Sequence, residues 1–358
     1  MDGPALLERL VAIPGVSGAE SAVAAAVLQA WEPLCDHVST DALGNVVGLL
    51  RADPPPPAGT RAPTLMLAAH TDEIGLVVTR IEAGGFLRLA AIGGIDRRYL
   101  PSLEVLVHGR EILPGLIGTL PPHLTTPETR GKPLPLDEAY VDVGLPEARV
   151  RELVSVGDRV TVDRPLGRLL GEVAYAKAMD DRGSVAALHE ALLRLRERRR
   201  SLQVAFVATV QEEVGLRGAA TSGYGLAPDL AIAVDVGHAR SPGVSEADGA
   251  SDLGKGPVVA QGGNFHPQIV RALLDAAGAE GIPHQREYLP GASGTDAWAI
   301  QVARAGVPCG LLSLPLRYMH SPVETLDLAD LRETGRLLAA FAAAADPAWV
   351  RGLTRVLK

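Results

Sequence analysis

The chain has 358 residues, enough for two domains of ordinary size, and it is 47% hydrophobic but only 4% aromatic. Its formal net charge of -8 argues against a nucleic acid or an anionic membrane as the main partner. Two cysteines make no disulfide framework, the N-terminus lacks the apolar core of a signal peptide, and no apolar stretch is long enough to cross a bilayer, so we expect a soluble cytoplasmic protein.

The first seventy residues have the pattern of an α/β segment. The apolar spacing of residues 4–13 predicts a helix, and Ser17 with Glu20 forms an S-x-x-E pattern that predicts a capping box for the Ala-rich helix after it. Residues 36–52 predict two short strands around a Gly-Asn turn. The run TLMLAAH predicts a buried strand that ends at His70.

The pattern changes between residues 75 and 163. Short segments such as GLVVTRI, LEVLVHG and DRVTVD are separated by turn residues, without a long helix, which is typical of a small β-barrel or β-sandwich. Helices and strands alternate again from Lys177, and these strands are apolar throughout, as in a sheet covered on both faces. We therefore predict an α/β domain, residues 1–74 and 164–358, with a β domain inserted at 75–163.

Acidic and histidine side chains stand where several predicted strands end. Asp72 follows His70 by two positions, and on an extended chain such positions face the same way. This spacing allows His70 to bind a metal while Asp72 accepts the other ring N–H, although such a pair taken alone more often has a structural role. Asp235 ends the apolar run LAIAVD, and His320 lies beside another strand end with Glu324 nearby.

Two pairs of adjacent acids complete this set. Asp180 and Asp181 precede a predicted helix, where they either cap the helix or bind a ligand. Glu212 and Glu213 follow a long apolar strand, a position that an ordinary acidic turn before Gly215 explains less well. Because ligands bind at the carboxyl ends of strands in open α/β sheets, we expect these side chains to meet in space.

The combined donor set predicts a centre for two divalent ions. Two histidines with three carboxylates suit Zn²⁺, Co²⁺ or Mn²⁺ better than Ca²⁺, and a carboxylate can bridge two ions about 4 Å apart. One of the adjacent glutamates is then expected to bind a metal. The other is expected to move protons to and from a water whose pKa the ions lower to about 7.

Six fragments in chain order, HTDEIG, AMDDRG, QEEVGLRGA, AVDVGHA, SGTDA and PLRYMHSPVET, resemble the M42 family of metallo-aminopeptidases. The resemblance covers nearly the whole chain, including the fragments GGIDRRYLPSLEVLVHGRE and GTLPPHL of the β region. It implies a zinc-exopeptidase-like, doubly wound α/β domain and an activity that removes N-terminal residues from peptides. It also implies assembly through the inserted β domain into a homo-oligomer, commonly a dodecamer.

The resemblance further implies how two metal ions are held. Asp180 would bridge both ions, and the peptide bond after it would be cis. His70 and Asp235 would complete one site, and Glu213 and His320 would complete the other. Zn²⁺, Co²⁺ and Mn²⁺ all remain compatible with these ligands.

The residues expected to transfer protons and to bind substrate come from the same fragments and their neighbours. Glu212 would be the general base and then the general acid. Asp72 would orient the ring of His70. Asp296 is our candidate for holding the free α-amine of the substrate. Asn264 stands where many family members have an acid, and His123 belongs to an insertion that can reach over an active site.

Other activities are compatible with parts of this pattern. A carboxypeptidase or an N-acyl amino-acid or peptide deacylase would use the same metal core, and a carboxypeptidase would need a cation such as Arg217 or Arg317 for the terminal carboxylate. A glycosidase needs two carboxylates and usually no metal, which leaves the histidines unexplained. A non-catalytic scaffold would be expected to lose Glu212 or a ligand, and none is lost.

Overall fold

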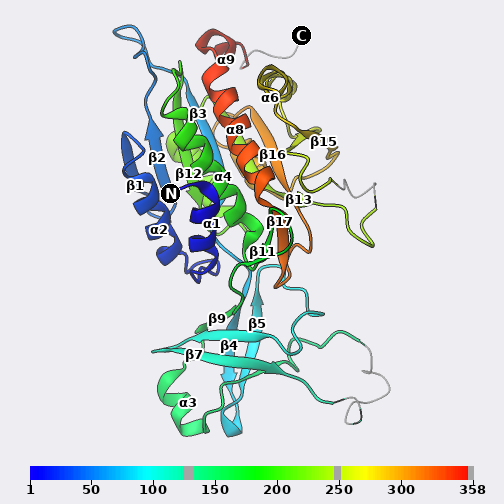
Figure 1. Ribbon diagram of the computed structural model, residues 1–358. Helices are drawn as coiled ribbons and strands as arrows, with labels where there is room; N and C mark the ends of the chain where they lie inside the picture. Colours follow the sequence, from blue (N-terminus) through cyan, green and yellow to red (C-terminus); the bar gives the residue numbers. More distant parts are fainter. Residues whose placement is uncertain (122, 124–131, 246–250, 354–358) are drawn as a thin grey trace.

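Eight strands form a mixed sheet at the centre of the larger part of the molecule (Figure 1). The structure is a computed structural model that describes residues 1–121, 123, 132–245 and 251–353. The order across the sheet is β1-β2-β12-β3-β13-β16-β14-β15. These strands are β1 His37–Thr40, β2 Val46–Leu50, β3 Thr64–His70, β12 Gln203–Thr209, β13 Leu230–His238, β14 Val258–Gln261, β15 Gln285–Tyr288 and β16 Cys309–Leu316. The central strands β12, β3, β13 and β16 run parallel, so their carboxyl ends lie at one edge of the sheet.

Helices cover both faces of this sheet. Leu65 and Leu67 of β3 pack in one apolar cluster, and the alternate residues Met66 and Ala68 pack in another. The first cluster includes residues of six helices: α1 Gly3–Val11, α2 Ser21–Trp31, α4 Met179–Leu195, α6 Pro267–Glu280, α8 Leu328–Ala344 and α9 Pro347–Leu353. The second cluster includes residues of α5 Arg217–Leu226 and α7 Asp296–Ile300. Burial on both sides explains why the strands are apolar throughout. The predicted doubly wound α/β fold is confirmed.

The predicted β region contains a closed barrel, which Figure 1 shows beyond the carboxyl edge of the large sheet. Its strand order is β4-β5-β8-β7-β6-β9, and its interior is a separate apolar cluster that includes Leu76, Leu87, Val105 and Val160. The barrel strands are β4 Gly75–Ile81, β5 Leu87–Ile92, β6 Glu104–His108, β7 Ile112–Gly118, β8 Tyr140–Asp142 and β9 Arg159–Val162, accompanied by the short helices η1 Ala83–Gly85 and α3 Glu147–Leu153. Closure removes the open edges that a flat sheet of this size would expose.

A small three-stranded sheet lies next to the junction with the barrel. It consists of β10 Gly167–Arg168, β11 Val173–Ala176 and β17 Glu324–Asp327, in the order β10-β11-β17. Antiparallel pairing places Glu324 opposite Ala176, three residues before α4 begins at Met179. This sheet therefore holds the segment after His320 against the first turn of α4.

The capping box expected at Ser17 and Glu20 does not form. Glu20 is the N-cap residue of α2 but makes no side-chain capping bond. Its carboxylate accepts the backbone N–H of Gly18 at 2.7 Å and that of Gln211 at 3.1 Å, while the Ser17 hydroxyl donates to Asp72 at 2.6 Å. Ser17 and Glu20 therefore connect this turn to the segments that follow β3 and β12, and they do not cap α2.

Among the described residues, no helix has both the length and the apolar character needed to span a membrane.

Candidate metal centre and active site

His70 is the last residue of β3 and lies at the centre of a buried cluster of carboxylates. Its Nε2 atom is 3.1 Å from Asp180 Oδ1, and its Nδ1 atom is 3.4 Å from Asp72 Oδ1. Its backbone N–H donates to Asp181 Oδ2 at 3.1 Å. Only 2% of His70 is exposed, so the ring is held between two carboxylates out of contact with bulk water.

Asp72 connects this histidine to the two adjacent glutamates. Its Oδ1 atom accepts the backbone N–H of Glu212 at 3.0 Å, and its Oδ2 atom accepts the N–H of Glu213 at 3.2 Å. The Ser17 hydroxyl also donates to Oδ2. Gln211, which precedes the glutamates, has a φ of +55°, so the chain turns sharply where β12 ends. One buried carboxylate thus fixes the loop that presents both glutamates.

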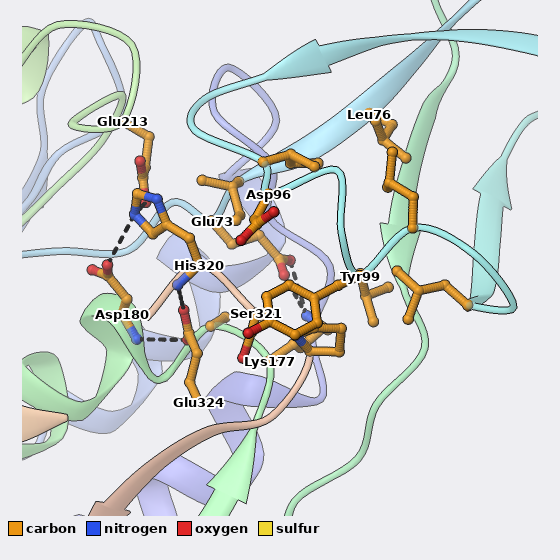
Figure 2. Close-up of a pocket in the computed structure, with 18 of the residues that line it drawn as sticks. Glu73, Leu76, Asp96, Tyr99, Lys177, Asp180, Glu213, His320, Ser321 and Glu324 are labelled. Atoms are coloured by element: carbon orange, nitrogen blue, oxygen red, sulfur yellow. Dashed lines mark hydrogen bonds and ion pairs between the residues drawn. The ribbon is translucent and has the colours of Figure 1, made fainter. Parts of the chain in front are cut away.

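Asp180 lies between His70 and His320, and Figure 2 shows it beside His320. Its Oδ2 atom is 3.3 Å from His320 Nε2, and the same nitrogen is 3.4 Å from Glu213 Oε1. Its other oxygen is the one beside His70. The buried Glu324 carboxylate accepts the backbone N–H groups of Asp180, at 3.1 Å, and His320, at 2.8 Å. Each oxygen of Asp180 therefore faces a different histidine.

Asp235 is buried near the carboxyl end of β13 and joins the same cluster. A ligand atom of Asp235 lies within 4.8 Å of ligand atoms of His70 and Glu212, and also within that distance of Asp180 and Asp181. The peptide bond between Asp180 and Asp181 is cis. The ends of β3, β12 and β13, the start of α4 and the segment before β17 thus converge on one buried centre, as the sequence predicts for the carboxyl edge of the sheet.

The pKa values of the groups in this centre are shifted by an excess of negative charge. Burial raises the pKa of Asp235, and the nearby Asp180 raises it further. Burial, with the charges of Asp235 and Asp296, raises the pKa of Glu212 to about 9. Hydrogen bonds to Asp180 and Glu213 raise the pKa of His320 to about 11. Each group thus shifts toward the form that reduces the local excess of negative charge.

The excess of negative charge in this cluster fits a donor set for divalent cations. No lysine or arginine among the described residues forms an ion pair with these carboxylates, whose only cationic neighbours are the two histidines. Asp181 Oδ1 is buried without a hydrogen-bond partner. Divalent ions bound by the nitrogen and oxygen donors would supply the missing charge.

A cavity of about 260 Å³ opens beside these groups. It is lined by the candidate metal ligands and Glu212 together with Val236, Gly237, His238, Glu287, Leu289, Ser293, Gly294, Thr295, Leu311, Ser313 and Met319. The cavity borders the candidate metal ligands directly, so a molecule bound in it would lie against the centre.

The structure places the three predicted substrate residues differently. Asp296, the first residue of α7, is buried and accepts the hydroxyl of Thr209 at 2.5 Å, and burial raises its pKa to about 6. It adjoins Thr295, which lines the cavity. None of the three residues lines the cavity itself: Asp296 lies behind Thr295, the Asn264 amide donates to the carbonyl of Gly291 at 2.6 Å, and His123 is exposed. Only Asp296 is brought near the centre.

The barrel contributes a contact that the sequence analysis missed. A Cβ atom on Gly94 would lie 2.9 Å from His320 Nδ1, and one on Gly93 would lie 3.4 Å from the Cβ of Glu213. This loop follows β5, and Figure 2 shows Asp96 and Tyr99 of its continuation facing the His320 side of the centre. The adjacent glycines were the available signal, because paired glycines often mark a close backbone approach.

The molecule combines a doubly wound sheet with a centre of histidine and carboxylate side chains at its strand ends, the place and the donor types that a metal-dependent hydrolase needs. Residues 56–337 match the family model for M42 glutamyl aminopeptidase. The lysyl aminopeptidase of Pyrococcus furiosus is 35% identical over 345 residues, which are 94% of this chain and 95% of that protein. The chain therefore belongs to the M42 aminopeptidase family, and the prediction of a metal-dependent aminopeptidase is confirmed.

Solved structures agree with this assignment. Aminopeptidase APDkam598 from the archaeon Desulfurococcus kamchatkensis has a TM-score of 0.90 and 36% identity, covering 99% of this chain and 98% of that one. The TET1 peptidase of Pyrococcus horikoshii, described as assembling into a tetrahedron or a large octahedral shell, has a TM-score of 0.83 and 32% identity, covering 96% of this chain and 100% of that one. A structure of PhTET1-12s with the same values is described as a dodecamer.

Proposed function

We propose that the protein removes N-terminal residues from peptides with two divalent ions held at the carboxyl edge of its large sheet. The placement of Asp180 carries this proposal, because its two oxygens lie 3.1 Å from His70 Nε2 and 3.3 Å from His320 Nε2. Asp180 would bridge the ions, with His70 and Asp235 on one side and Glu213 and His320 on the other. When bound, the ions supply Lewis acidity and lower the pKa of the attacking water.

Glu212 is the proposed proton carrier. It lines the cavity, and its Oε2 atom lies 3.9 Å from His70 Nε2, so it stands beside the ligand cluster. The carboxylate would accept a proton from the attacking water and donate it to the nitrogen of the leaving peptide. Asp72 would keep Glu212 in place through the backbone N–H bond and would also orient the ring of His70.

The lining of the cavity favours an aminopeptidase over a carboxypeptidase. A terminal carboxylate needs a cation, and no lysine or arginine is among the described residues that line the cavity. Arg217 donates to the side chain of Gln211, and Arg317 donates to the carbonyl of Arg240. The buried Asp296 is the proposed group for the free α-amine of the substrate, which an N-acyl deacylase would not need to bind.

The barrel is the proposed assembly domain. Residues of β7 alternate between the interior and the surface, and the outward residues Ile112 and Leu116 are 59% and 55% exposed. Exposed apolar residues in a row are typical of an interface. Together with the dodecameric and tetrahedral relatives, this supports a homo-oligomer, with a dodecamer as the specific proposal. The cytoplasmic location stays a prediction.

The activity is tested with a panel of aminoacyl-p-nitroanilides and an N-acetylated control. The enzyme is stripped with a chelator and refilled separately with Zn²⁺, Co²⁺ or Mn²⁺. We expect metal-dependent release from free-amine substrates only. Cleavage of the acetylated control, or no release with any metal, would contradict the proposal and favour the deacylase or carboxypeptidase.

A further inference from the structure

A buried carboxylate in the wall of the active-site cavity has no role in the proposed reaction. Glu287 of β15 lines the cavity and is only 8% exposed. Its Oε1 atom accepts the hydroxyl of Ser313 at 2.6 Å, and no ion pair to it is found among the described residues. Burial raises the pKa of Glu287, opposed only by the Ser313 bond. The carboxylate is thus desolvated and lacks a cationic partner.

The strand register places this carboxylate beside the metal centre. Ser313 of β16 pairs with Asp235 of β13, so the two side chains lie on neighbouring strands of the same face. A Cβ atom on Gly237 would lie 3.0 Å from the Cβ of Ser313 and 3.9 Å from Glu287 Oε2, so this glycine leaves space in front of the carboxylate. The backbone of β15 is three strand positions from β13, but the Glu287 carboxylate reaches Ser313, which stands directly beside Asp235 on the neighbouring strand.

The rest of the cavity wall suits a substrate side chain that is long and has a charged end. Leu289, Leu311 and Met319 line the same cavity and provide apolar surface. The four-carbon stem of lysine, or the three-carbon stem of arginine, packs on such surface while its charged head reaches a polar partner. A negatively charged residue would instead be repelled by the buried carboxylate.

We propose that Glu287 forms the floor of the pocket for the substrate's N-terminal side chain and selects lysine or arginine there. This inference rests on the proposed aminopeptidase function and specifies its substrate class. With the α-amine held by Asp296 and the scissile carbonyl placed at the candidate metal centre, the side chain would extend across β16 and β14 toward β15. The cationic head then donates a charge-assisted hydrogen bond to the free oxygen of Glu287.

The wild-type enzyme allows a direct test with three p-nitroanilides, those of lysine, norleucine and glutamate. Norleucine has the lysine stem without the ammonium group, so the ratio of kcat/KM between the two substrates measures the charge alone. We expect lysine to exceed norleucine by about tenfold to a hundredfold, the range of a charged hydrogen bond, and glutamate to be the poorest substrate. A ratio near one, or a preference for norleucine, would overturn the inference while metal-dependent release from norleucine would still support the aminopeptidase.

The variant Glu287→Gln keeps the size of the side chain and removes its charge. The lysine-to-norleucine ratio is expected to fall to about one, with kcat/KM for norleucine changed by no more than about twofold. An equal loss on both substrates would mean that Glu287 does not contact the side chain, and it would also overturn the inference. The matched control is Glu152→Gln on α3, an exposed acid of the barrel, which should leave the ratio unchanged. The norleucine comparison needs no variant, so it decides the question even if Glu287→Gln does not fold.

Discussion

Asp72 accepts the backbone N–H of Glu212 at 3.0 Å, and the same carboxylate oxygen lies 3.4 Å from His70 Nδ1. The residue that orients a candidate metal ligand therefore also positions the candidate base. Asp72 is fully buried, and its pKa is lowered because bonds from His70, Ser17 and the Glu212 backbone outweigh the effect of burial. A substitution at Asp72 is thus expected to disturb the metal ligand His70 and the base Glu212 together.

Asp72→Asn tests this coupling. The amide group cannot accept hydrogen bonds at both of its terminal atoms, so at least one of the bonds from His70, Glu212 or Glu213 is lost. We expect kcat to fall by about tenfold to a hundredfold, as for other residues that orient metal ligands. The measurement is kcat together with metal content per subunit. Ser17→Ala, which removes only the hydroxyl bond to Asp72, should cause a smaller loss, and an equal or larger one would contradict the account.

Gly94→Ala tests the contact between the barrel loop and His320. The new methyl group would lie 2.9 Å from His320 Nδ1, so the ring or the loop must move. We expect metal affinity at this side of the centre to fall by about tenfold or more, measured by competition with a chromophoric chelator. Gly263→Ala is the matched control, because a Cβ atom there meets open space. Wild-type affinity in Gly94→Ala would show that the barrel loop does not hold the ring in place.

Glu73→Gln tests a buried ion-pair network behind the centre. The Glu73 carboxylate binds Lys177 at 2.7 Å and the fully buried Arg182 at 3.2 Å. Removing its charge leaves two buried cations uncompensated, and we expect a loss of about 3–5 kcal/mol in the free energy of unfolding. The measurement is urea denaturation. Asp275→Asn, which removes an exposed partner of Arg271, should change little.

The stability of the wild type and of Glu73→Gln, measured as a function of pH, gives a second test of this network. Burial raises the pKa of Glu73, but the charges of Lys177 and Arg182 outweigh it and hold the pKa below the ordinary value of 4.5. Because the folded-state pKa lies below the unfolded one, the stabilisation by Glu73 is fully present above pH 4.5 and is lost as the pH falls through the folded value. The difference in stability between wild type and Glu73→Gln should therefore shrink at acidic pH. A difference that grows there would contradict the assignment.

Ile112→Asp and Leu116→Asp together test assembly through the barrel. Both side chains are more than half exposed on β7, so the substitutions should leave the folded subunit intact. We expect sedimentation to show a smaller particle than the wild type, with an unchanged far-UV circular dichroism spectrum. Arg80→Asp, at another exposed position of the barrel, serves as the control. An unchanged particle would place the interface elsewhere.

The strands that carry the centre are predictable from the sequence because apolar runs with abrupt polar ends leave little choice of structure. TLMLAAH corresponds to β3 residue for residue, and the convergence of its end with those of β12 and β13 follows from parallel pairing. The bonds of Ser17 and the approach of Gly94 were not predictable, since they depend on how separate segments meet. Helix α5 was also missed, because its sequence RGAATSGYGL is rich in small residues and has no clear apolar period.

The position of Glu287 in the cavity was likewise not predictable from the sequence. It lies in the short strand QREY, which has no apolar run, and its place in the cavity arises from β15 pairing with β14 at the far side of β16. The expectation that Asn264 and His123 line the substrate site came from the family resemblance alone, and the structure brings neither to the cavity. The position of Glu287 depends on which distant strands pair, whereas His70 and Asp235 lie at or near the carboxyl ends of apolar runs that the sequence itself shows.

The most direct test of the account is a titration of the chelator-stripped enzyme with Zn²⁺, with release of p-nitroaniline from a free-amine substrate followed at each addition. Glu212→Gln is titrated beside the wild type, and bound metal is counted in both. We predict that wild-type activity reaches its plateau at two ions per subunit, and that the variant binds the same two ions but turns over about a hundredfold to ten-thousandfold more slowly. A plateau at one ion, or wild-type turnover in Glu212→Gln, would contradict the central claim.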